Sequence, residues 1–352
     1  MKEFLYAANP MRVVFGAGAL AQLPREIEQL GANKALVLST PVQRAAAEQV
    51  AQRLGDRAAG VFAEAVMHVP IETAREAREV ARRLGADCAV AIGGGSTTGL
   101  GKAIALDSGL PILAIPTTYA GSEMTPIYGL TEGGLKRTGR DVRVLPRTVI
   151  YDPELTLDLP LPMAIASGLN AIAHAVEGLY ARDSNPITSL MAEEGIRALA
   201  AALPELRPDH SDIEARSQAL YGAWLCGAVL GQVGMALHHK LCHTLGGSFN
   251  LPHAEVHSVI LPHAIAYNAP AIPAELARLR RVLGPHPAAA LYDLARDHGV
   301  PYSLSGLGLA EADLERAADL AVADPYWNPR PVDRAGIRAL LQDAWQGRRP
   351  ET

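Results

Sequence analysis

The strongest constraint on the fold is a change of hydrophobic pattern near residue 158. Before it, short apolar runs that end in small polar residues alternate with amphipathic segments, a pattern typical of parallel strands joined by helices. The predicted strands cover residues 34–39, 88–95, 112–118 and 147–153, and residues 72–86 have the spacing of a helix that ends at a glycine. We therefore predict an α/β dinucleotide-binding domain with a doubly wound parallel sheet over residues 1–157.

The second half of the chain has a different pattern. Its long Ala- and Leu-rich segments are interrupted by Pro and Gly, without the alternation typical of strands. We predict an all-α domain over residues 158–352, with several helices buried on more than one face. The proline-rich residues 153–162 are the predicted hinge. A cleft between the two domains is the expected place for a ligand.

Composition excludes several classes of partner. The formal net charge of −5 and the pI of about 6.1 leave no basic surplus for nucleic acid or an anionic membrane. The three cysteines are scattered without a CxxC motif, which argues against a disulfide framework or a zinc knuckle. Neither a cationic leader nor a long apolar span is present. We expect a soluble, cytoplasmic protein.

Two polar loops predict a nucleotide site. The segment AIGGGSTTGLGKA (91–103) places glycines at the end of a strand and the start of a helix, where backbone N–H groups can bind a diphosphate. The spacing is not GxGxxG. A second loop, IPTTYAGSEMTP (115–126), offers donors for ribose or nicotinamide, although a solvated turn would look the same. The predicted cofactor-binding residues are Gly94, Gly95, Ser96, Thr97, Thr117, Thr118, Tyr119 and Ser122.

The first strand predicts the cofactor's specificity. Residues 34–39 are followed by no acidic side chain, and the chain has Ser39 and Thr40 there instead. A carboxylate at this position would accept from the 2′-hydroxyl of NAD and repel the 2′-phosphate of NADP. We therefore predict that both NADH and NADPH are accepted.

Histidines at helical spacing predict a second site. Asn170 and His174 lie four residues apart, as do His239 and His243, and His253 follows. Spacing i,i+4 puts both side chains on one helix face, as in helical metal sites. Asn170, however, offers a neutral amide where a carboxylate would be needed, which weakens the binding of a divalent ion. We predict a hydrogen-bonding pocket of histidines that holds no metal.

Several motifs together resemble the iron-containing (group III) alcohol dehydrogenases. They are GGGS after a strand, PTT followed by GSE, the N-x3-H pair, the H-x3-H…PH cluster and LPHAIAYN. More narrowly, MRVVFGAGAL, GGGSTTGLGKAIAL, TGRDVRVLPRTVIYDPELTL and ADPYWNPRPV resemble the maleylacetate reductase branch. The resemblance covers nearly the whole chain. It implies a dinucleotide-binding domain followed by a helical domain, an architecture shared with dehydroquinate synthase, and a homodimer.

The resemblance also implies roles for individual residues. The family's metal ligands fall on Asn170, where the family has Asp, and on His174, His239 and His253. An additional active-site histidine falls on His243. The family's cofactor-binding Asp falls on Gly99. The branch is known for NADH- or NADPH-dependent reduction without added metal, which agrees with the amide at position 170.

The implied reaction is reduction of the C=C bond of maleylacetate to 3-oxoadipate, in the degradation of aromatic compounds. Hydride addition gives an enolate whose charge is spread, so hydrogen-bond donors can replace a metal. We expect His243 or His253 to stabilise or protonate the enolate. The small dicarboxylate substrate needs cationic or polar partners, for which the candidates are Lys240, His238, Arg137 and Tyr326.

Three alternatives stay open at this point. One is a metal-dependent alcohol or lactaldehyde dehydrogenase of the same family, and another is a lyase similar to dehydroquinate synthase. Both need a metal, so Asn170 speaks against them. The third is a non-catalytic nucleotide-binding protein, which the histidine cluster and both polar loops disfavour.

Overall fold

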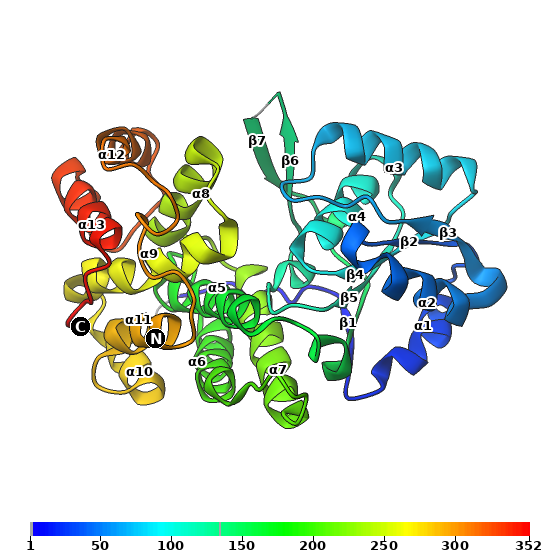
Figure 1. Cartoon of the computed structure of the whole chain (residues 1–352), viewed down its shortest axis with the longest axis horizontal. Helices are drawn as coiled ribbons and strands as arrows, with labels where there is room; N and C mark the ends of the chain where they lie inside the picture. Colours follow the sequence, from blue (N-terminus) through cyan, green and yellow to red (C-terminus); the bar gives the residue numbers. More distant parts are fainter. Residues whose placement is uncertain (1–2, 134) are drawn as a thin grey trace. The chain divides into compact units, whose positions relative to one another are not determined.

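The computed structural model describes residues 3–133 and 135–352, and its contacts divide them into two compact units. One unit comprises residues 8–159 and the other residues 160–352 together with 3–7. The sequence placed the boundary between residues 157 and 158. It did not predict that the first residues would pack with the helical unit. Figure 1 draws the elements of each unit.

The α/β unit is built on a six-stranded parallel sheet with the order β1-β8-β5-β4-β2-β3 (Figure 1). All four predicted strands are present, each slightly shorter than predicted. Two edge strands, β1 and β3, were not predicted. The bounds are β1 Arg12–Phe15, β2 Ala35–Leu38, β3 Ala58–Phe62, β4 Cys88–Gly93, β5 Ile112–Pro116 and β8 Thr148–Tyr151.

Helices cover both faces of this sheet. Apolar side chains of α1 (Leu23–Gln29) and α2 (Arg44–Leu54) pack on one face, and those of α3 (Ile71–Arg83) and α4 (Gly95–Ser108) pack on the other. Because side chains alternate along a strand, both faces of a central strand such as β4 are buried. This explains the continuous apolar runs in the sequence and confirms the predicted doubly wound domain.

The sequence did not predict the antiparallel hairpin of β6 (Ile127–Glu132) and β7 (Leu135–Arg140). β6 is only partly buried, so it lacks the continuous apolar run by which the strands of the main sheet were recognised. Arg137 lies exposed on β7, where its backbone pairs with Leu130.

The other unit is all-α, as predicted, and no described helix has the length and apolar character needed to cross a bilayer. Its central helix is α5, of 20 residues, which is buried from Ala164 to Tyr180 and packs against α6, α7 and α9. A second apolar core joins α8, α9, α12 and α13. The bounds are α5 Leu161–Tyr180, α6 Pro186–Ala202, α7 Ile213–Leu230, α8 Leu237–Phe249, α9 His253–Asn268, α10 Pro273–Leu283, α11 Pro287–Asp297, α12 Asp313–Ala323 and α13 Arg334–Gln346.

Short 3₁₀ turns complete the elements of both units. One of them, at Pro153–Thr156, lies in the predicted hinge segment. The others are Ala19–Gln22, Pro41–Gln43, Gly55–Arg57, Ser122–Met124, Val142–Val144, Leu203–Glu205 and Ala269–Ala271.

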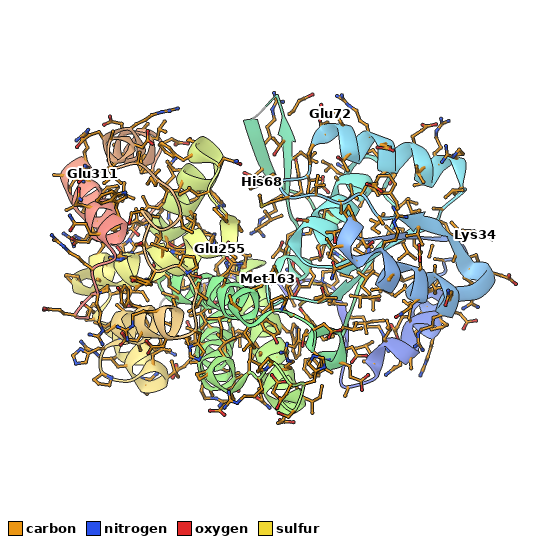
Figure 2. All side chains as sticks on the ribbon, in the orientation of Figure 1. Lys34, His68, Glu72, Met163, Glu255 and Glu311 are labelled. Carbon is orange, nitrogen blue, oxygen red and sulfur yellow. The ribbon has the colours of Figure 1, made fainter. Side chains whose placement is uncertain are left out.

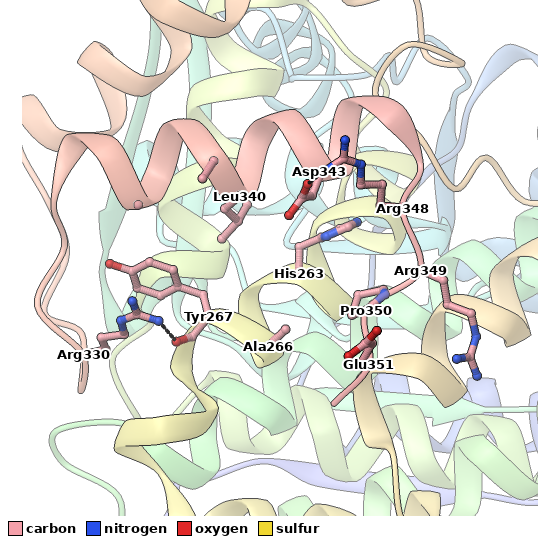
Figure 3. A pocket seen from close by; sticks show the side chains of 12 residues that line it. His263, Ala266, Tyr267, Arg330, Leu340, Asp343, Arg348, Arg349, Pro350 and Glu351 are labelled. Carbon is pink, nitrogen blue, oxygen red and sulfur yellow. Dashed lines mark hydrogen bonds and ion pairs between the residues drawn. The ribbon is translucent and has the colours of Figure 1, made fainter.

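A cavity of about 480 Å³ lies in the helical unit between α9, α13 and the last residues of the chain (Figure 3). His263 lines it with its ring almost fully buried, and Nε2 has no hydrogen-bond partner among the described residues. Burial lowers the pKa of His263 to about 4, although the nearby Asp343 carboxylate acts in the opposite direction.

His263 makes folding stability sensitive to acid. Its pKa is about 4 in the folded chain and about 6.5 when unfolded. Between these values the unfolded chain binds the extra proton, so stability is lost as the pH falls below about 6.5. Chemical denaturation should show the wild type losing about 2 kcal/mol more than His263→Gln between pH 7.5 and pH 5. His286→Gln, at an exposed histidine, is the control and should follow the wild type. Equal losses in wild type and His263→Gln would contradict this prediction.

Candidate active site

Three helices of the helical unit bring six histidines together. They are His174 on α5, His238, His239 and His243 on α8, and His253 and His257 on α9. His257 lies at the centre of this histidine cluster. Its ring centroid is 4.4 Å from that of His253, 4.8 Å from that of His238 and 5.0 Å from that of His239. Five of the six, all except His257, are among the residues that the sequence predicted for the site.

Glu177 of α5 anchors the cluster. Its carboxylate is fully buried and accepts hydrogen bonds from the backbone N–H groups of Ala236 at 2.8 Å and His238 at 2.7 Å. These groups lie at the start of α8, where N–H groups have no partner within the helix. Glu177 therefore caps α8 from another helix, and its negative charge suits the positive end of the helix dipole.

The same carboxylate fixes the proton position on His239. Nδ1 of His239 lies 2.7 Å from Glu177 Oε2, and an acceptor-only carboxylate requires Nδ1 to carry a proton. In the neutral imidazole, Nε2 of His239 is then an acceptor. Nδ1 of His174 lies 2.9 Å from it and donates. A chain of hydrogen bonds thus runs from Glu177 through His239 to His174.

His238 makes its hydrogen-bond contacts outside this chain, although its ring centroid lies 5.1 Å from that of His239. It is fully buried, and its Nε2 lies 2.9 Å from Nδ1 of His257 and 3.6 Å from Sγ of Cys242. Burial, and next the neighbouring histidines, lower the pKa of both His238 and His257 well below the usual range, so both rings are neutral. This environment does not favour the substrate contact that the sequence suggested for His238.

A more accessible group lies on the next turn of α8. Nδ1 of His243 lies 3.0 Å from the hydroxyl of Tyr326, and Nζ of Lys240 lies 5.7 Å from the centroid of the Tyr326 ring. All three side chains are only partly buried. The structure therefore brings together three of the residues predicted to contact or protonate a substrate.

In the α/β unit, the glycine loop connects β4 to α4. Gly93 has a φ of 148°, and a Cβ there would lie 2.5 Å from Thr97 Oγ1, so this position requires glycine. The helix begins at Gly95 and the first helical hydrogen bond runs from Thr98 N to Gly94 O, which leaves the preceding N–H groups for an anion. Gly94, Gly95 and Ser96 are at least partly exposed.

The other predicted loops follow the C-terminal ends of the strands next to β4, so all three loops lie at the same end of the parallel strands. Thr117 follows β5, Ser39 and Thr40 follow β2, and both strands flank β4. Gln43, which the sequence analysis did not single out, links them by donating to Thr117 Oγ1 at 2.9 Å. Thr40, Thr118 and Ser122 are partly exposed. The side chains of Ser39, Thr97, Thr117 and Tyr119 are buried.

A buried lysine holds the second polar loop. Nζ of Lys102 on α4 donates to Ser122 O at 2.7 Å, Thr125 Oγ1 at 2.9 Å and Ile127 O at 2.7 Å. Burial lowers the pKa of Lys102 to about 7, while the charge of Glu123 acts in the opposite direction. Glu123 is itself buried and accepts from the hydroxyl of Tyr151 at 2.6 Å. Lys102 therefore fixes the loop that carries Ser122.

Sequence reasoning missed several of these supporting residues. Glu177 lies three residues after His174 and His257 lies four after His253, so the helical spacing rule could have found both. Lys102 is a lone cation within the apolar run of α4, which is a signal of burial. Gln43 lies in a 3₁₀ turn, and nothing in its neighbourhood marks it as a link between two loops.

The fold and these two groups of residues define a dinucleotide-binding domain joined to a helical domain with a histidine cluster. Residues 10–153 match the family described as "Iron-containing alcohol dehydrogenase", and residues 164–345 match "Fe-containing alcohol dehydrogenase family, C-terminal". The chain belongs to the iron-containing alcohol dehydrogenase family and is an oxidoreductase.

Within this family the chain is similar over its whole length to maleylacetate reductases. It is 66% identical to that of Burkholderia cepacia, over 99% of this chain and 100% of the relative. It is 57% identical to that of Rhizobium sp. strain MTP-10005, over 100% of both chains. The crystal structure of maleylacetate reductase from Agrobacterium tumefaciens superposes with a TM-score of 0.96 at 58% identity, over 99% of this chain and 100% of that one.

The residues at the family's metal positions do not fit the iron that the family name implies. Asn170 provides an uncharged amide, and its buried Oδ1 has no hydrogen-bond partner among the described residues. The donor set thus lacks the anion that offsets the charge of a divalent ion.

Position 99, where this chain has Gly and the family has Asp, lies close to Val69. A Cβ at Gly99 would lie 2.8 Å from Cγ2 of Val69, so a larger side chain requires Val69 to move. Val69 has a φ of 44° and His68 a φ of 65°, which β-branched or bulky residues rarely adopt. The segment before α3 therefore fills the space next to position 99.

Replacement of Glu177 tests its role as the anchor of α8. Glu177→Gln keeps the shape but removes the charge and one acceptor oxygen, so the free energy of unfolding should fall by about 2 kcal/mol. Chemical denaturation measures the change. The control is Glu194→Gln, which removes an exposed ion pair with Arg197 and should cost less than about 1 kcal/mol. Equal effects of the two substitutions would show that Glu177 does not anchor α8.

Proposed function

We propose that the chain reduces the C=C bond of maleylacetate to 3-oxoadipate with NADH or NADPH, in the breakdown of aromatic compounds. The observation that carries the proposal is full-length similarity to maleylacetate reductases at 54–66% identity. The alternatives, a metal-dependent alcohol dehydrogenase and a lyase similar to dehydroquinate synthase, are not favoured because both need the metal that Asn170 disfavours.

In this proposal the dinucleotide binds in the α/β unit at the C-terminal ends of β2, β4 and β5. Support comes from the uncapped N–H groups at the start of α4, which suit a diphosphate, and from the partly exposed Thr118 and Ser122. Because no carboxylate follows β2, the 2′-phosphate of NADPH meets no repulsion from that strand. Both cofactors are therefore accepted.

The reaction proceeds by conjugate addition. The nicotinamide hydride adds to the alkene carbon β to the ketone, the C=C electron pair moves to the ketone oxygen, and an enolate forms. A proton then adds to the carbon next to the ketone. The enolate charge is spread over oxygen and carbon, so oriented hydrogen-bond donors stabilise it without a metal. Lys240 supplies a positive charge for one carboxylate of the dianionic substrate.

His243 stabilises or protonates the enolate in this proposal. It is more accessible than His174 or His239, and its Nδ1 is held by Tyr326. His253, also partly buried, is the second candidate for the same step. His174, His239 and Asn170 shape the pocket.

Removal of the His243 imidazole tests this assignment. For His243→Ala, kcat for maleylacetate should fall by about a hundredfold or more, because a positioned acid is lost. Tyr326→Phe removes only the hydroxyl that orients the ring and should lower kcat by about tenfold. Steady-state NADH oxidation measures both. An unchanged kcat in His243→Ala would transfer the role to His253.

Removal of metal tests the proposed independence from metal. Protein treated with EDTA and checked for residual metal should oxidise NADH with maleylacetate at its full rate, because no step uses a Lewis acid. Addition of Fe²⁺ or Zn²⁺ should not raise the rate. Activity that appears only after an ion is restored would refute this mechanism. Inactivity under both conditions would point to another substrate, with simple alcohols and aldehydes tested next.

The chain is also proposed to work as a homodimer in the cytoplasm, without nucleic acid or membrane partners. The three cysteines are buried and unbridged in the described structure, which suits a reducing compartment. Light scattering of the purified protein measures the mass of the assembly, and fractionation of cells measures its location.

A further inference from the structure

A second group of potential ligands lies next to the family's metal positions but shares none of their residues. Within the described part of the chain, ligand atoms of His238, Cys242 and His257 lie within 4.8 Å of one another. All three side chains are at most 1% exposed. We call them the His–Cys–His group, and the catalytic roles proposed above use none of them.

The spacing of these atoms suits an ion. Zn–S and Zn–N bonds of about 2.3 and 2.0 Å place tetrahedral ligand atoms roughly 3.3–3.6 Å apart. Cys242 Sγ lies 3.6 Å from His238 Nε2, and the two ring nitrogens lie 2.9 Å apart. The third pair, Cys242 Sγ and the His257 nitrogen, lies within 4.8 Å, so the sulfur and this ring approach each other when all three atoms bind one ion.

Helix geometry maintains this arrangement. His238 and Cys242 are four residues apart on α8, so they share one face of that helix, and His257 reaches them from α9. Glu177 holds the start of α8 through the His238 backbone N–H group. The ligands therefore come from two packed helices rather than from a loop.

The hydrogen bonding of the group is also incomplete. His238 Nε2 and His257 Nδ1 share one proton, while His238 Nδ1 and His257 Nε2 are buried with no hydrogen-bond partner among the described residues. Such atoms are costly in a folded protein. An ion binds the two nitrogens that face each other, so these outer nitrogens carry the ring protons in the bound state.

We propose that His238, Cys242 and His257 form a site for a soft or borderline divalent ion such as Zn²⁺, distinct from the family's metal positions. Binding forms one bond to the Cys242 sulfur and one to a nitrogen of each histidine. The thiol proton leaves to solvent, and the proton shared by the two rings moves to an outer ring nitrogen, so both rings stay neutral. A thiol and two imidazoles select Zn²⁺ or Co²⁺ over Mg²⁺ and Ca²⁺.

Cobalt tests the site, because a thiolate bound to Co²⁺ gives an intense near-ultraviolet charge-transfer band. Metal-stripped full-length protein titrated with Co²⁺ should develop this band to one equivalent, and Zn²⁺ should abolish it by displacement. Zn²⁺ should also raise the melting temperature of the wild type, because the ion links α8 to α9.

Matched variants assign the ligands. Cys242→Ser and His257→Gln should both lose the band and the Zn²⁺-dependent rise in melting temperature. Cys226→Ser, at a buried cysteine on α7 outside the group, should keep both. If Cys242→Ser does not fold, His257→Gln with Cys226→Ser as its control decides the question.

Three results would overturn the proposal. The first is the absence of a charge-transfer band in the wild type, and the second is a band that survives in Cys242→Ser. The third is that the wild type binds Co²⁺ without showing the band and that His174→Gln no longer binds Co²⁺. The last result would place the ion at the family's positions. None of these measurements uses NADH or maleylacetate, so their outcome is independent of the proposed reaction.

Discussion

The histidine cluster depends on the buried carboxylate of Glu177. One side chain of α5 accepts two backbone N–H groups at the start of α8 and the Nδ1 proton of His239. A buried carboxylate is stable only when its oxygens are satisfied, and here the positive end of a helix and an imidazole do this. The same contacts set where α8 begins, which way its histidines point and which nitrogen of His239 carries the proton.

An amide at position 170 changes the chemistry that this scaffold favours. A mononuclear metal centre combines neutral imidazoles with an anion that offsets the charge of the ion. With Asn170 this charge is missing. Reduction of an activated alkene tolerates this loss better than reduction of a simple carbonyl, because an enolate spreads its charge. The uncharged Asn170 is therefore consistent with the reaction for which the chain's relatives, the maleylacetate reductases, are named.

Much of the fold could be predicted from the sequence. The strands at 35–38, 88–93, 112–116 and 148–151 are buried on both faces and therefore form continuous apolar runs. Short edge strands such as β1, and the antiparallel hairpin with its partly buried strand β6, have no such run, so they were missed. Their strand conformation depends on pairing with distant segments, and the sequence pattern alone does not contain this information.

The site residues also fall into those that the sequence predicted and those that it missed. Helical spacing identified Asn170, His174, His239 and His243 because residues four apart share a face whatever the helix packs against. The roles of Glu177, His238 and Lys102 depend on which distant groups they meet. Glu177 meets a helix start 59 residues away, and Lys102 meets a loop more than 20 residues away. For His238, its position beside the predicted histidine cluster suggested substrate contact, but packing turned its ring toward His257.

The sequence by itself determined the α/β and helical halves, the glycine loop, the histidine pairs and the loss of an anionic ligand at position 170. These properties follow from local periodicity and from the identity of single side chains. Only the tertiary structure decided which nitrogen of His239 is protonated, which side chains are buried, and that Cys242 lies beside two histidines. Such properties depend on contacts between helices that are distant in sequence, and local patterns do not specify those contacts.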